Sequence, residues 1–113
     1  MTDENEGVRK DGLSSSATAT NAVSVEALAV TTGRTFVLTD IIVNTPAARV
    51  EAEVYDDTAT TSLTAANIKM QVTAPAVITN IENGPEFATG VCVALTQTAN
   101  LNTGAVWVGG IER

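Results

Sequence analysis

The chain has 113 residues, a length that predicts a single domain. Thirteen acidic and six basic residues give a net charge of −7, which argues against nucleic acid as a partner because phosphate binding depends on clustered lysine and arginine. The chain contains no histidine, so the commonest general acid–base side chain and the commonest zinc ligand are both excluded.

Residues 1–19 contain almost no apolar side chains and end in a run of Ser, Thr and Ala. This composition predicts a flexible N-terminal arm that is either a mobile terminus or a tail that becomes ordered on a partner. The acidic start of the arm is unlike a signal peptide, and no apolar run reaches the ~20 residues of a membrane span. We therefore expect synthesis in a cytoplasm and no membrane partner.

From residue 20 to 113 apolar residues recur with a period of two between turn residues. The expected strands are 22–30, 34–43, 48–56, 67–73, 76–82, 87–97 and 104–112. The stretch 57–66 is expected to be a loop that could hold one helical turn near Leu63. Strand spacings of about 8–12 residues predict an all-β fold. The expected fold class is a single β-sandwich or jelly-roll-like domain of seven to eight antiparallel strands, residues 20–113, with an extended N-terminal arm.

Three of these strands are apolar on both faces, although a strand in a two-sheet sandwich gives only one face to the core. In the first, strict alternation places Phe36, Leu38 and Ile42 on one face and Val37, Ile41 and Val43 on the other. The other two carry the sequences GVCVAL (90–95) and AVWVGGI (105–111).

Exposed apolar faces of this size usually mark an interface, and a core of small side chains benefits from sharing a surface with neighbours. We therefore expect self-association or binding to a scaffold. Two alternatives are that the arm or the loop 57–66 covers these faces, or that small outward side chains are tolerated in solvent.

The paired carboxylates do not predict a catalytic or metal site. Glu51 and Glu53 lie two residues apart on one strand and share its solvent face. Asp56 and Asp57 begin a loop that lacks the ligand alternation, glycine turn and terminal glutamate of a calcium site. We expect no catalytic residue, no cofactor-binding residue and no metal ligand, and hence no enzyme.

Other polar or reactive positions have structural interpretations. Asp40 interrupts an apolar strand, so it either pairs with an arginine of another subunit or is turned outward by a bulge. Gly109 and Gly110 inside a strand predict a bulge or a close backbone approach. Cys92 stands between apolar neighbours and is expected to be a buried, inert thiol. The serines at 14–16 have no base to activate them.

Three stretches carry a resemblance to a known class of protein: GRTFVLTDIIVNTPAARVEAEVYDD (33–57), APAVITNIENGPEFATGVCVAL (74–95) and GAVWVGGIE (104–112). Together they resemble small decoration (cement) proteins of tailed bacteriophage heads, over about residues 33–113. The resemblance implies a structural virion protein that trimerises, binds the major capsid protein on the outer surface of the head and is assembled in the host cytoplasm. It transfers no site residue.

An alternative function is a receptor- or carbohydrate-binding β-sandwich module of a phage tail or fibre. Sugar sites favour exposed aromatic rings, and only Tyr55 and Trp107 are candidates. Trp107 stands between valines and is expected to lie in the core.

Overall fold

The computed structural model describes residues 7–18, 22–44, 50–58, 63–96 and 102–113. These residues form nine strands and one 3-10 turn, η1 (Ala65–Asn67). None of them belongs to a helix long and apolar enough to span a bilayer. The strands are β1 (Val8–Thr18), β2 (Ala22–Ala29), β3 (Phe36–Asn44), β4 (Val50–Asp56), β5 (Ile68–Ala74), β6 (Ala76–Ile78), β7 (Glu86–Phe87), β8 (Gly90–Thr96) and β9 (Asn102–Glu112).

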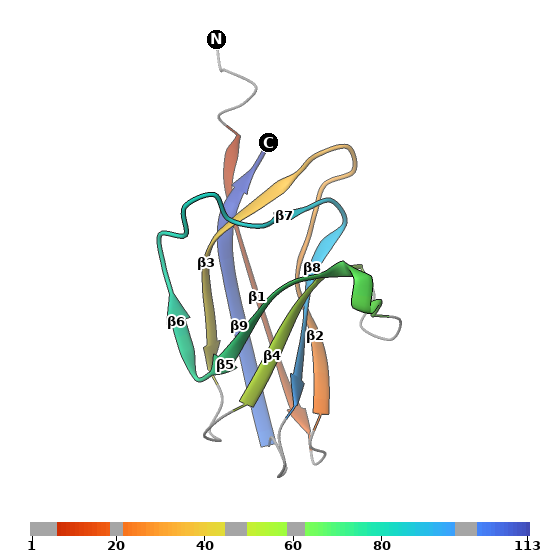
Figure 1. The fold of residues 1–113 in the computed structure, drawn as a ribbon, viewed down its shortest axis with the longest axis vertical. Coiled ribbons are helices and arrows are strands. Elements are labelled where there is room, and N and C mark those ends of the chain that lie inside the picture. The colour runs from red at the N-terminus through yellow and green to blue at the C-terminus, as the bar shows by residue number, and fades with distance from the viewer. Residues whose placement is uncertain (1–6, 19–21, 45–49, 59–62, 97–101) are drawn as a thin grey trace.

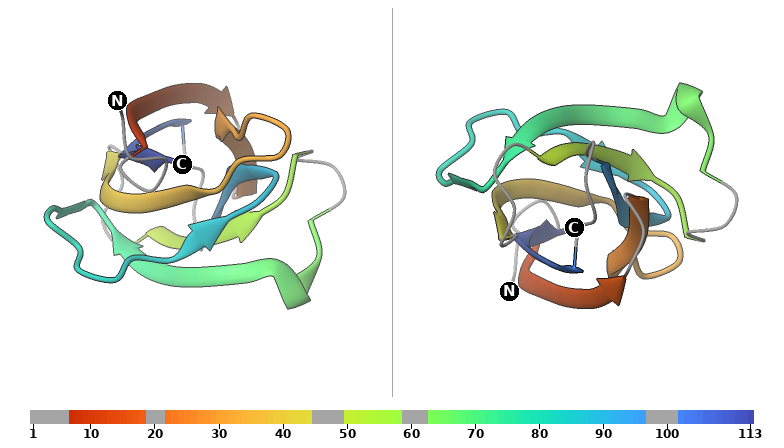
Figure 2. Two further views of the ribbon diagram at one scale, coloured as in Figure 1. Left: turned by 90° about the horizontal axis from the view of Figure 1, so that it is seen from above. Right: turned by 90° about the horizontal axis from the view of Figure 1, so that it is seen from below.

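The strands form two antiparallel sheets packed face to face (Figures 1 and 2). Sheet A has the order β1-β9-β3-β6, with β7 also paired to β3, and sheet B has the order β2-β8-β4-β5. The chain passes repeatedly from one sheet to the other, so the two sheets enclose one core, as in a jelly roll. The expected all-β sandwich is confirmed.

Strand β1 differs from the expectation of a flexible arm. Residues 8–18 pair with β9 along their whole length, from Val8 opposite Glu112 to Thr18 opposite Asn102. The alternation of apolar residues does not predict this strand. It is held in the sheet by main-chain hydrogen bonds and charged side chains, and these contacts produce no apolar pattern in the sequence. Residues 1–6 and 19 of the expected arm lie outside the described residues.

The core lies between the sheets and consists of small aliphatic side chains around two phenylalanines. Phe36 of β3 and Phe87 of β7 are fully buried, with ring centroids 6.3 Å apart and planes tilted by 53°. Such tilted pairs stabilise a core beyond their buried area, by about 0.5–1.5 kcal/mol. The two rings close one end of a core that is otherwise mostly valine.

A β-bulge in β3 corrects the face assignment made from strict alternation. Leu38 pairs with Gly110 and Asp40 with Gly109, so Thr39 is an extra residue between them. The extra residue shifts the alternation by one. Ile41 is consequently buried on the same side as Leu38, and Ile42 lies on the outer face.

The outer sides of β8 and β9 have different environments. On β8, Cys92 is fully buried and its Sγ lies 3.0 Å from the main-chain oxygen of Asp57, so the segment after β4 covers it. The alternative that this loop covers an apolar face is thus confirmed for Cys92. On β9, Val106 and Val108 enter the core and Trp107 lies half-buried on the outer face. The expectation that Trp107 is a core residue was wrong.

Candidate functional site

An apolar row crosses the outer face of sheet A at one level of the strand register. Leu13 of β1 pairs with Trp107 of β9, Trp107 with Ile42 of β3, and Ile42 with Val77 of β6. Directly paired residues point to the same side of a sheet. Leu13 and Val77, at the two ends of the row, are 71% and 68% exposed. With strands about 4.8 Å apart, the apolar row is roughly 15 Å wide.

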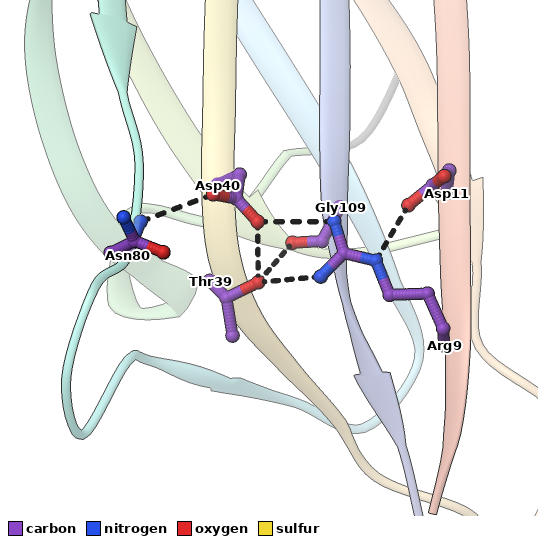
Figure 3. A network of polar contacts seen from close by, with 6 residues as sticks. All are labelled: Arg9, Asp11, Thr39, Asp40, Asn80 and Gly109. Carbon is purple, nitrogen blue, oxygen red and sulfur yellow. Dashed lines mark hydrogen bonds and ion pairs between the residues drawn. The ribbon is translucent and has the colours of Figure 1, made fainter.

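Beside the apolar row, Asp40 is the centre of a polar network that the bulge creates (Figure 3). Its Oδ2 accepts hydrogen bonds from the Thr39 hydroxyl at 2.7 Å and the Arg9 guanidinium at 3.1 Å. Its Oδ1 accepts from the Asn80 main-chain N–H at 3.1 Å. The Thr39 hydroxyl, the Asn80 N–H and Arg9 together hold the pKa of Asp40 below its usual value.

This geometry decides between the two alternatives for Asp40. The bulge turns the carboxylate outward, and the arginine that pairs with it is Arg9 of the same chain. Arg9 also donates to the Thr39 hydroxyl at 3.1 Å, and its Nε lies 3.3 Å from Asp11. Strand β1 is therefore tied to β3 across the intervening strand β9.

Gly109 makes room for the side chains that gather on this face. A Cβ atom at Gly109 would lie 2.6 Å from Arg9 Nη2, 2.9 Å from Asp11 Oδ1 and 2.9 Å from Trp107 Cη2. The tryptophan ring, the guanidinium and the carboxylate thus converge above a residue that has no side chain. The close backbone approach predicted for this glycine pair is confirmed at Gly110, where a Cβ atom would meet the main-chain oxygen of Val37.

A cleft of about 380 Å³ adjoins the network on the same face. The cleft is lined by Val37, Thr39, Ile81, Asn83, Gly84, Glu86 and Arg113. Thr39 belongs to both the network and the cleft, and Arg113 and Glu86 form an ion pair of 3.1 Å at the cleft. The outer face of sheet A therefore combines an apolar row, a fixed polar network and a shallow depression.

The outer face of sheet B is acidic and polar by contrast. Glu51 and Glu53 lie on it, as expected, opposite Thr73 and Gln71, whose side chains donate to them at 3.4 Å. Glu26 of β2 is also exposed.

Asp56 and Asp57 hold loops in place. Burial acts to raise the pKa of Asp56, but hydrogen bonds from the main chain of Thr89, Ala88 and Gly90 and from the Thr89 hydroxyl keep it below its usual value. Asp57 accepts from the Thr64 N–H at 3.2 Å and the Asn67 amide at 3.1 Å. Both carboxylates therefore already accept hydrogen bonds from donors within the chain.

Cys92 is a buried thiol, as expected from the sequence. Burial, followed by the nearby charges of Glu26, Asp57 and Asp56, raises its pKa to about 11. A protonated and enclosed thiol is a poor nucleophile. In the part of the chain that the structure describes, no three metal-ligating side chains form a cluster. Ser14 lies in β1, and the side chains of Ser15 and Ser16 are outside the described residues.

No protein-family model matches the sequence, and no curated protein matches it. Among solved structures the chain is similar to the NLP core of Drosophila, a structure described in terms of pentamer formation and histone binding. The TM-score is 0.39 and the identity 15%, over 92% of this chain and 98% of the other. A likeness of this degree carries no argument about function.

Proposed function

We propose that this chain is a structural virion protein, a decoration (cement) protein that binds the outer surface of a phage head as a homo-oligomer, a trimer, and stabilises the shell. It acts by binding and not as an enzyme, its partners are its own copies and the major capsid protein, and it is assembled in the host cytoplasm. The observation that carries the proposal is the apolar row on sheet A.

Charge supports sheet A as the contact face. The strands of sheet A and Arg113 carry three cations and four carboxylates, a net charge of −1, and most of these charges are paired within the chain. The strands of sheet B carry one cation and four carboxylates, a net charge of −3. Desolvation of unpaired charges opposes binding, so the apolar, internally neutralised face is the better one to bury.

The resemblance to head decoration proteins supports the major capsid protein as the partner. The stretches that carry this resemblance include the bulged strand β3 and most of strand β9. These two strands supply Ile42 and Trp107 to the apolar row. A homo-oligomer that presents several copies of this face gains avidity on a repetitive shell, because each bound copy raises the effective concentration of the next.

The test is cosedimentation of the purified full chain with undecorated heads of the phage that encodes it. We expect saturable binding with a fixed number of copies per head, and a rise in the temperature at which decorated heads release DNA. Heads that neither retain the protein nor gain thermal stability would contradict the proposal.

One observation favours the second candidate, a carbohydrate- or receptor-binding module. Trp107 is half-buried on the outer face, beside a network of carboxylates, a hydroxyl and a guanidinium. An aromatic ring next to fixed hydrogen-bonding groups suits a sugar, which is apolar on one side and polar at its edge. A glycan array probed with the full chain and with Trp107→Ala tests this function. Binding by the unaltered chain alone would support it.

A further inference from the structure

The described side chains of strand β1 contribute nothing to the hydrophobic core. Among its described side chains, Val8 to Ser14, none is buried, while Val8 and Leu13 are about 70% exposed. The buried residues come from β2 to β5, β7, β8 and β9. The sandwich without β1 would therefore keep every described side chain of its core, which lies between β9-β3-β6 and sheet B.

What holds β1 is main-chain pairing and ionic contacts. Eleven residues pair with β9 in uninterrupted register. Lys10 Nζ lies 2.8 Å from Glu112 Oε2 and 2.8 Å from the main-chain oxygen of Ala29, and Arg9 reaches Asp40. Gly12 lets the backbone of β1 pass directly against the main-chain oxygen of Ala27 in β2.

These contacts can be re-formed without change by a second copy. Every one joins β1 to another part of the sandwich, so a β1 supplied by a neighbour meets the same β9 edge, the same Glu112 and the same Asp40. A sheet edge with unpaired N–H and C=O groups is a template for another strand. No described strand precedes β1, so its departure requires no other described strand to unpair.

We propose that β1 is an exchanged strand: in the oligomer, β1 of one copy pairs with β9 of the next and closes a ring. The inference rests on the proposed self-association and explains how it occurs without burying the apolar row. The same bonds form whether β1 pairs with β9 of its own chain or with β9 of a neighbour. Protein concentration therefore sets the proportion of monomer to ring. In the ring, Leu13 of a neighbouring copy completes the apolar row of each subunit.

The experiment uses a disulfide that a surface contact between subunits cannot form. Ser14 and Val106 are direct partners across β1 and β9, and Val106 is fully buried on the inner face. Paired Cα atoms in antiparallel strands are about 4.5–5.5 Å apart, within the range of a disulfide. The full chain with Ser14→Cys and Val106→Cys, in a Cys92→Ala background, is assembled at increasing concentration and then oxidised.

The matched control is Val54→Cys with Val93→Cys in the same background. These residues are direct partners in β4 and β8, and both are fully buried. Their strands are central in sheet B and each is paired on both sides, so we do not expect them to exchange. Non-reducing electrophoresis and intact mass are expected to show covalent multimers for the β1–β9 variant, increasing with concentration, and single chains for the control.

Single chains with an internal β1–β9 disulfide at every concentration would overturn the exchange. If light scattering still gave an oligomer, the proposed self-association would survive that result. Free thiols after oxidation would contradict the register and overturn the inference as well. Covalent multimers that fail to bind heads would support the exchange and contradict the decoration function.

Discussion

Glu112 connects three segments that are distant in the sequence. Its carboxylate accepts hydrogen bonds from Lys10 Nζ at 2.8 Å, the Thr31 N–H at 2.9 Å and the Thr31 hydroxyl at 2.7 Å. These groups, with Lys10 first, lower the pKa of Glu112 from its ordinary 4.5 to about 2. The ionised form is therefore favoured in the folded chain.

This carboxylate makes stability depend on pH in a specific direction. Because its folded pKa is lowered, its stabilisation is present above about pH 4.5 and is lost as the pH falls towards about 2. We expect Glu112→Gln to unfold at a lower temperature than the unaltered chain at pH 6, and the difference to shrink as the pH approaches 2. Thermal unfolding followed by circular dichroism measures both. Glu51→Gln, on the exposed face of sheet B, is the control, and a difference that does not change with pH would count against this role.

Gly109 and Gly110 are adjacent, but alanine substitution is expected to destabilise the fold to different extents at the two positions. A Cβ atom at Gly109 meets the side-chain ends of Arg9 and Asp11 and the ring of Trp107. A Cβ atom at Gly110 meets the main-chain oxygen of Val37 and, at 2.7 Å, the buried ring of Phe36. Side-chain ends can move at little cost, whereas backbone and a packed ring cannot.

We therefore expect Gly110→Ala to lower the free energy of unfolding by roughly 3 kcal/mol, and Gly109→Ala by about 1 kcal/mol or less. Gly109→Ala should instead shift the fluorescence of Trp107, the chain's one tryptophan, because the ring must leave its position. Urea titration and emission spectra separate the two effects. Equal destabilisation by both substitutions would refute the distinction.

At the scale of elements, β1 should open before the rest of the sandwich. Its described side chains are outside the core, and segments with few buried apolar contacts exchange their amides by local opening. We expect β1 amides to be at least roughly tenfold less protected than those of β8, which is paired on both sides. Hydrogen exchange followed by mass spectrometry or NMR measures this. Equal protection of the two strands would mean that β1 opens only with the whole fold.

Sequence periodicity found the elements whose apolar side chains enter the core. The seven expected strands overlap β2–β6, β8 and β9. The expected strand 87–97 was wrong at its start, because Phe87 belongs to β7 in sheet A and β8 begins at Gly90 in sheet B. Periodicity could not find β1, whose exposed Val8 and Leu13 do not differ in pattern from a polar tail. It also placed Ile41 and Ile42 on the wrong faces, because a bulge depends on the partner strand, where Gly109 and Gly110 accept the close approach.

The candidate site, like the fold, could be predicted only in part from the sequence. Asp40 was recognisable in the sequence as a polar residue in an apolar strand, and a bulge was one of its two predicted explanations. Its partner Arg9 lies 31 residues away, in the segment expected to be an arm. Trp107 was assigned to the core from its valine neighbours, but in a strand those neighbours are what place it on the opposite face. The apolar row itself depends on the register of four strands, which no local pattern specifies.

At the scale of the whole molecule, the two sheet faces differ in charge and in apolar surface, and this difference can be tested by substitution. Leu13 and Val77 are largely exposed, so lysine at both positions should change the free energy of unfolding by only about 0.5 kcal/mol each. The same double change places two charges at the ends of the apolar row. We expect Leu13→Lys with Val77→Lys to abolish cosedimentation with heads, because each ammonium would have to be desolvated at the contact.

The control is Gln71→Lys with Thr73→Lys, two exposed residues on the outer face of sheet B. It adds the same charge to the face that we do not assign to the shell, so head binding should persist. Light scattering on both variants separates the contact with the shell from the contact between copies. If strand exchange builds the oligomer, both variants keep the mass of the unaltered protein. If the sheet A variant falls to a monomer instead, the apolar row is the interface between subunits, and the shell must bind elsewhere.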